Sequence, residues 1–250
     1  MIKMIKIFPN IEELNNFTAE QFVAIGKEAI KKRGYFTITL AGGSTPQSLY
    51  RLFSSKIFKT KIAWAKVYFF FGDERSVLPD DAESNFRMAY ENIFQPLKIA
   101  DKNIFRWQTE LENAGINAQD YERKITNFFD LTENKFPQFD LILLGMGADG
   151  HTASLFPFTD ALHETDKIAV ANPVEKLNTT RLTLTFPTIN NARNIIFLVA
   201  GAEKAETLRE VLEGDFAPDK LPAQNVRPKD GNLFWLLDEN VAKLLRTYAN

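Results

Sequence analysis

The sequence has no cysteine, and it has only two histidines, His151 and His163. The absence of cysteine excludes disulfide scaffolds, thiolate metal sites and thiol redox chemistry. It also has no excess of charge of one sign, since 30 Lys and Arg face 32 Asp and Glu. Proteins that bind nucleic acids usually carry a clustered basic excess, so we expect no nucleic-acid partner and favour a small-molecule substrate.

Long apolar runs are absent as well. No stretch approaches the roughly 20 apolar residues that cross a bilayer, and the apolar run at the N-terminus is too short for a secretory signal. We therefore expect a cytoplasmic protein without a membrane partner. With 45% apolar residues and 22 Phe, the chain can build a large aromatic core. No internal repeat or linker divides it, which predicts a single domain over residues 1–250.

Apolar runs alternate with helical patterns along the chain. Strands are expected at 36–41, 66–72, 139–145, 181–186, 194–201 and 232–238, and helices from residue 46, at 84–94, near 117–130, at 202–214 and at 239–249. Several of these strands are apolar throughout, which is typical of a sheet buried on both faces. The alternation predicts an α/β fold with a mostly parallel central sheet and helices on both faces.

In such folds, ligands bind beyond the carboxyl ends of the strands, so we expect the site in the loops there. The first loop places Gly42, Gly43, Ser44 and Thr45 ahead of Pro46. Ser44 or Thr45 is expected to cap a helix whose N-terminus could bind an anion such as phosphate. A plain tight turn with a capped helix explains this loop equally well.

Charged residues follow two further strands. Asp73, Glu74 and Arg75 come after the strand at 66–72, and we expect all three to face solvent or the ligand crevice. Arg181 opens a later strand, and Lys204 lies in the first turn of a helix, where the helix dipole favours an anion nearby. Surface cations are the alternative explanation for Arg181 and Lys204.

The loop at 145–154 matches G-x-G-x-x-G directly after a strand, as in dinucleotide-binding folds. Pro157 follows too soon for the helix that such a motif requires, so we reject that interpretation. The loop also contains His151, which can accept a proton near neutral pH. A lone histidine is more often a structural hydrogen-bonding residue, but the surrounding glycines, Asp149, Thr152 and Ser154 favour a catalytic role. His163 lies in a polar segment and is expected to be solvated.

The segments 42–46, 73–75 with 84–85, and 145–157 resemble 6-phosphogluconolactonases, and the similarity continues through 181–193, 201–205, 221–228 and 234–242. The related glucosamine-6-phosphate deaminases typically have tyrosine where this chain has Arg75, and a different sequence after the histidine. Ala41, where serine is common, and an additional Leu78 depart from the pattern. The resemblance implies a three-layer, Rossmann-like domain shared with the deaminases.

The resemblance also implies an activity, the hydrolysis of 6-phospho-D-glucono-1,5-lactone in the oxidative pentose phosphate pathway, with no metal and no cofactor. His151 would be the general base, oriented by Asp149 or Asp73, while Arg75, Arg181 and Lys204 would meet the phosphate or the carbonyl oxygen. The other residues expected to bind the substrate are Gly42, Gly43, Ser44, Thr45 and Asn85. A deaminase-like aldose/ketose enzyme and a non-catalytic sugar-phosphate sensor remain alternatives, and both a monomer and a homodimer are compatible with the sequence.

Overall fold

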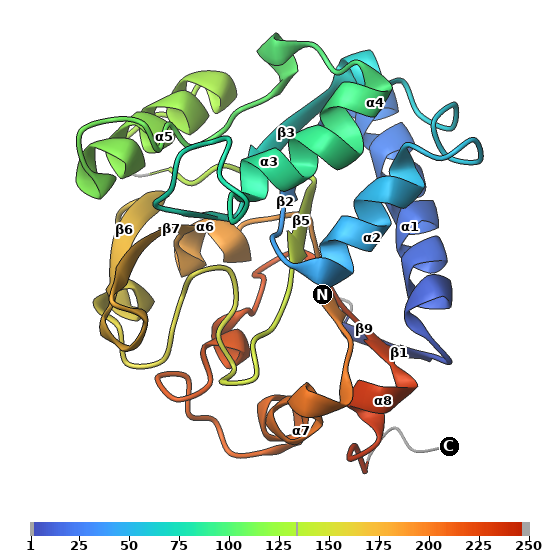
Figure 1. Cartoon of the computed structure of the whole chain (residues 1–250), viewed down its shortest axis with the longest axis vertical. Helices are drawn as coiled ribbons and strands as arrows, with labels where there is room; N and C mark the ends of the chain where they lie inside the picture. Colours follow the sequence, from blue (N-terminus) through green and yellow to red (C-terminus); the bar gives the residue numbers. More distant parts are fainter. Residues whose placement is uncertain (1–2, 134, 247–250) are drawn as a thin grey trace.

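The computed structural model describes residues 3–133 and 135–246 (Figure 1). Six parallel strands form the central sheet, in the order β1-β9-β8-β5-β2-β3. Their bounds are β1 Lys3–Phe8, β2 Phe36–Leu40, β3 Val67–Phe71, β5 Leu141–Leu144, β8 Asn194–Val199 and β9 Asn232–Asp238. The predicted α/β architecture with a parallel central sheet is confirmed.

Three further strands form a separate antiparallel sheet, in the order β4-β7-β6. They are β4 Asp73–Arg75, β6 Ala169–Val174 and β7 Thr179–Leu184. The charged segment 73–75 was expected to be a loop, but it is a strand that pairs with β7. Gly72 connects the two sheets, since its N–H donates to Leu40 of β2 and its carbonyl accepts from Leu184 of β7.

The α-helices are α1 Ile11–Arg33, α2 Ser44–Phe53, α3 Asn85–Ala89, α4 Gln95–Leu97, α5 Ala114–Phe129, α6 Phe186–Asn190, α7 Ala205–Glu213 and α8 Glu239–Ala242. The helix expected at 84–94 is α3 followed by a π-helical turn at Tyr90–Phe94, and the one at 202–214 begins with the 3₁₀ turn η6, Ala202–Lys204. The helix expected at 239–249 ends early, at Ala242, and its positions 247–249 lie outside the described residues. None of the helices described could cross a lipid bilayer.

Besides β4, the elements β1, α1, β6 and α6 were not foreseen. Helix α1 begins after Asn10, whose side chain accepts from the N–H of Glu13, and ends at Gly34 in the left-handed region with φ 86°. Its buried face contains the polar Asn15 and Thr18 among apolar residues, and these interrupt the helical hydrophobic pattern. Asn15 donates to Ser48 of α2, so the two helices that Figure 1 shows side by side are joined by a polar contact.

Both faces of the central sheet are covered, as the apolar strands predict. On one face, Phe69 of β3 packs against Phe94, with ring centroids 5.1 Å apart. On the other face, its neighbour Phe70 packs against Phe128 of α5 and against Phe139. Phe69 and Phe70 are both fully buried, because successive residues of a strand point to opposite faces.

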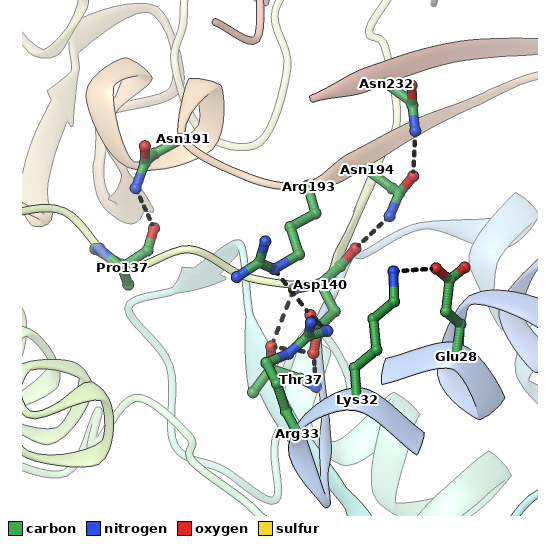
Figure 2. A network of polar contacts seen from close by, with 10 residues as sticks. All are labelled: Glu28, Lys32, Arg33, Thr37, Pro137, Asp140, Asn191, Arg193, Asn194 and Asn232. Carbon is green, nitrogen blue, oxygen red and sulfur yellow. Dashed lines mark hydrogen bonds and ion pairs between the residues drawn. The ribbon is translucent and has the colours of Figure 1, made fainter. Parts of the chain in front are cut away.

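The amino ends of the strands are joined by a buried carboxylate, Asp140, which is 1% exposed (Figure 2). One oxygen of Asp140 accepts from the N–H and the hydroxyl of Thr37, at 3.0 and 3.1 Å. The other oxygen contacts the guanidinium groups of Arg33 and Arg193. The Asp140 carbonyl accepts from Asn194. This network connects α1, β2 and β8 at the edge of the sheet where the strands begin.

Candidate active site

A cleft lies beyond the carboxyl ends of β2, β3 and β5, where the fold class predicts ligand binding. It consists of two adjoining cavities of about 250 and 580 Å³. Asp73, Arg75, His151 and Ala153 line both cavities. The smaller one, the glycine-loop chamber, also has Gly42, Gly43, Ser44, Thr45 and Lys204 in its wall. The larger one, the arginine chamber, adds Asp149, Phe156, Lys176 and Arg181.

The glycine loop begins helix α2 without the expected side-chain cap. Gly43 is the N-cap residue, with φ 100°, and among the described residues no side chain caps the helix. The prediction that Ser44 or Thr45 is the cap is therefore wrong, because both residues are already in the helix. The N–H groups of the first turn and the positive end of the helix dipole are left for an anion in the chamber.

Asn85 supports this loop from behind instead of lining the two chambers. A Cβ added to Gly42 would lie 2.1 Å from the Asn85 side-chain oxygen, so only glycine allows this close approach. The Asn85 side-chain nitrogen donates to the carbonyl oxygen of Asp73 at 3.0 Å. Asn85 is thus buried between two parts of the site, and its predicted contact with substrate stays a prediction.

The three charged residues of β4 do not all face the cleft. Glu74 is buried, at 2% exposed, which corrects the expectation that all three face solvent or the ligand crevice. Burial raises the pKa of the Glu74 carboxyl, while backbone N–H groups of Asn85, Arg75 and Phe86 donate to it and oppose that shift. Glu74 thus anchors the start of α3 to the small sheet.

Asp73 lines both chambers but is held by a neighbour other than the histidine. Its Oδ2 accepts a 2.7 Å hydrogen bond from the buried hydroxyl of Ser154. Ser154 lies on the histidine loop, so this contact ties that loop to β4. Asp73 thereby couples the two sides of the cleft.

His151 has a carboxylate partner two residues earlier in the chain. Its Nδ1 lies 2.5 Å from Oδ1 of Asp149, and its backbone N–H donates to the same oxygen. The ring of Phe156 stacks on the imidazole with centroids 4.2 Å apart. Of the two carboxylates expected beside His151, Asp149 is the one that contacts the imidazole.

Asp149 has a second cationic neighbour, since Nζ of Lys176 contacts its Oδ2. Burial alone would raise the pKa of Asp149, but hydrogen bonds from His151 and Lys176 outweigh burial and lower it below its usual range. The carboxylate is therefore ionised throughout the neutral range. Its geometry suits it to orienting an imidazole and stabilising an imidazolium.

The glycines after β5 form a turn, and no helix occurs in the described segment 145–158. The rejection of a dinucleotide fingerprint agrees with this geometry. A Cβ on Gly147 would lie 2.2 Å from the ring of His151 and 2.8 Å from Asp149, so glycine is required for the imidazole to pack here. In dinucleotide-binding folds the glycines make room for a pyrophosphate, whereas here they make room for the side chain of His151.

Arg75 and Arg181 face each other directly in the register of β4 and β7. Burial, together with the charge of Arg75, lowers the pKa of Arg181. Within the described part of the chain, Nε of Arg181 is buried and has no hydrogen-bond partner. Two opposed cations, one of them with an unused donor, are suited to bind an anionic ligand, with the carboxylate of Asp73 beside them. Lys204 adds a third cation at the glycine-loop chamber.

The model of one family, described as glucosamine-6-phosphate isomerases/6-phosphogluconolactonase, matches residues 9–235. The chain belongs to this family. A 6-phosphogluconolactonase of Synechocystis sp. is 43% identical over 220 residues, covering 88% of each chain. One of Nostoc sp. is 38% identical over 239 residues, covering 95% of this chain and 96% of its own.

The fold of the family is equally clear in solved structures. The structure of 6-phosphogluconolactonase from Trypanosoma brucei, reported with its catalytic mechanism, has a TM-score of 0.85. It is 31% identical and covers 98% of this chain and 99% of its own. The resemblance noted in the sequence and the Rossmann-like fold expected from it are both confirmed.

Two side chains of the site were not predicted: Lys176 and Phe156. Lys176 comes from the 3₁₀ turn η5, Glu175–Leu177, between β6 and β7. In the sequence it is an ordinary turn lysine, 27 residues from Asp149, and only the pairing of the two strands brings it to the cleft. Phe156 lies within the family motif, but its stacking on His151 depends on the fold of the loop. Among residues 3–133 and 135–246, no cluster of His, Asp and Glu could hold a metal ion.

Proposed function

We propose that this chain hydrolyses 6-phospho-D-glucono-1,5-lactone to 6-phosphogluconate. The observation that carries the proposal is the pairing of His151 with Asp149 at the junction of the two chambers. Relatives that match nearly the full chain bear the name 6-phosphogluconolactonase, which favours the lactonase over the deaminase. Arg75 and the sequence after His151 favour the same side of the family. We also propose a cytoplasmic location and no nucleic-acid or membrane partner.

The mechanism uses His151 as a general base. With Nδ1 held by Asp149, Nε2 takes a proton from the water that attacks the C1 carbonyl. The carbonyl electrons move to the oxygen, where Arg75 and Arg181 stabilise the negative charge. When the intermediate collapses, the bond from C1 to the ring oxygen breaks and the imidazolium returns its proton to that oxygen. The carboxylic acid formed then loses its proton to solvent.

The phosphate would lie in the glycine-loop chamber, against the N-terminus of α2 and Lys204. Backbone N–H groups at a helix N-terminus and a nearby ammonium group are a common arrangement for binding phosphate. Binding the phosphate there uses a part of the substrate far from the reacting carbon to fix C1 near His151. Arg75 and Arg181 would then remain available for the reacting end of the sugar.

The activity is tested with freshly generated phospholactone, by comparing its clearance with spontaneous decay in a coupled assay. We expect saturable clearance well above the spontaneous rate, and no ammonia from glucosamine 6-phosphate. Ammonia release would instead support a deaminase. Thermal stabilisation by sugar phosphates without turnover would support a sensor and contradict the lactonase.

The placement of the phosphate is tested with Lys204→Ala. A charge-assisted hydrogen bond contributes about 1.5–3 kcal/mol, so we expect KM to rise roughly 10- to 100-fold while kcat changes little. Steady-state kinetics on the phospholactone measures both. An equal fall of kcat and kcat/KM would place Lys204 at the reacting end instead.

A further inference from the structure

Lys176 belongs to a closed set of four contacts around the imidazole. Its Nζ contacts Oδ2 of Asp149, whose Oδ1 contacts Nδ1 of His151. His151 stacks on Phe156, and Nζ of Lys176 lies 4.9 Å from the centroid of the same Phe156 ring. The lysine therefore contacts both partners of the histidine without contacting the histidine itself.

This arrangement restrains Asp149 from two sides. A carboxylate with only one partner can rotate about χ2 and exchange its oxygens, whereas here each oxygen has its own cationic or imidazole neighbour. Lys176 comes from the turn between β6 and β7, and Asp149 from the loop after β5. The contact therefore also joins the small sheet to the histidine loop at the cleft.

The charge of Lys176 has a second consequence. A carboxylate beside an imidazole stabilises the imidazolium, and a cation on the same carboxylate opposes that stabilisation. The other charged groups lining the chambers around His151 are Asp73, Arg75, Arg181 and Lys204. All of them are retained when Lys176 alone is replaced, so a change in the protonation of His151 would report on Lys176.

We propose that Lys176 is a positioning residue for the reaction: it fixes Asp149 against His151, and its charge opposes the stabilisation of an imidazolium by that carboxylate. The proposal rests on the lactonase function proposed above. Lys176 does not have to touch the substrate for this role. It acts through Asp149, both by its hydrogen bond and by its positive charge.

The test compares the pH dependence of kcat/KM in wild type, Lys176→Met, Lys176→Gln and Lys176→Arg. In the acid limb of this profile, kcat/KM falls as the pH is lowered. For Met and Gln we expect the midpoint of that fall to move to a higher pH by about half a unit, a modest shift because the lysine is half exposed. We also expect kcat/KM near pH 7 to fall about 10-fold, part of the contribution of a general base. Lys176→Arg keeps the positive charge, so its acid limb should coincide with that of wild type. Lys32→Met, which removes an exposed ion pair with Glu28, is the matched control and should change nothing.

An acid limb that coincides with wild type in both neutral variants would overturn the proposal, whatever happens to kcat. A titration of the imidazole by NMR separates this outcome from failure of the lactonase assignment. In a His163→Gln background, His151 is the one remaining histidine, so its ring signals are unambiguous. Lys176→Met should shift the midpoint of their titration upward even if no lactone is hydrolysed, and an unchanged midpoint would contradict the proposal.

Discussion

Polar groups are paired in opposite ways at the two ends of the central strands. At the edge where the strands begin, the Asp140 carboxylate is met by two guanidinium groups and by both donors of Thr37 (Figure 2). Beyond the edge where the strands end, Arg75 of β4 and Arg181 of β7 face each other as like charges in the small sheet. Nε of Arg181 is buried without a partner in the described part of the chain.

The difference separates residues that stabilise the fold, at the amino ends of the central strands, from residues suited to function, beyond their carboxyl ends. Donors and acceptors that are paired within the protein stabilise the folded state and have no capacity left for a ligand. Cations held close together, and a helix N-terminus without a side-chain cap, destabilise the empty protein but suit an anionic substrate. We therefore expect substitutions in the cleft to lower activity with little loss of stability, and substitution of Asp140 to lower stability with little loss of activity.

The largest effect is expected at the cleft, from His151→Gln. Loss of the general base should lower kcat on the phospholactone by about 10²- to 10⁴-fold, while the melting temperature changes little. Steady-state kinetics and thermal unfolding measure the two quantities. His163→Gln is the matched control, because His163 is exposed and its Nε2 lies near the exposed Asp219, so the activity of this variant should equal that of wild type. Full activity in His151→Gln would remove the basis of the mechanism.

The next effect is at the opposite edge, from Asp140→Ala. Removing the carboxylate leaves the buried N–H of Thr37 unpartnered and two guanidinium groups uncompensated, so we expect a loss of about 3 kcal/mol in the free energy of unfolding. Denaturant unfolding measures it, and kcat/KM of the folded fraction should stay within about twofold. Asp219→Ala, at an exposed aspartate, should cost under about 0.5 kcal/mol. Equal losses in the two variants would contradict the comparison.

The smallest effect on stability, and the sharpest test of the comparison, comes from Arg181→Met. Removing one of two directly opposed like charges should raise the free energy of unfolding by about 0.5 kcal/mol while kcat/KM falls. Arg209→Met on α7 is the control, because Arg209 is near a glutamate rather than a second arginine. A destabilised Arg181 variant would show that the opposed arginines are compensated within the protein.

Most strands of the central sheet could be predicted because they are largely apolar runs, whereas β1, which contains Lys3 and Lys6, was missed. Residues 67–71 and 194–199, for example, have to be buried on both faces, and few structures other than a covered parallel sheet achieve this. The second sheet could not be predicted, since the pattern of β7 does not say which sheet it joins. The position of β7 depends on its pairing with 73–75. Three consecutive charged residues are not expected in a strand, and only the structure shows that Glu74 is buried and accepts from backbone N–H groups.

In the site, too, residues close in sequence could be predicted, whereas residues brought in by the fold could not. Asp149 and His151 lie two residues apart, so local sequence could place them together, and the structure shows which carboxylate contacts the ring. Lys176 is distant in sequence and occupies an ordinary turn, so no local signal predicts it. Gly147 has to be glycine because the imidazole of His151 occupies the space that a side chain would fill there.

The order of strands also determines when β1 can fold during synthesis of the chain. β9 lies between β1 and β8. β1 therefore pairs with a strand that is more than 220 residues away in the chain, and Figure 1 shows the two side by side. A nascent chain emerging from the ribosome therefore holds β1 without its neighbour until nearly all of the polypeptide has been made. A premature stop codon before residue 232 would leave β1 and β8 each with an open edge, which invites strand pairing between molecules and aggregation.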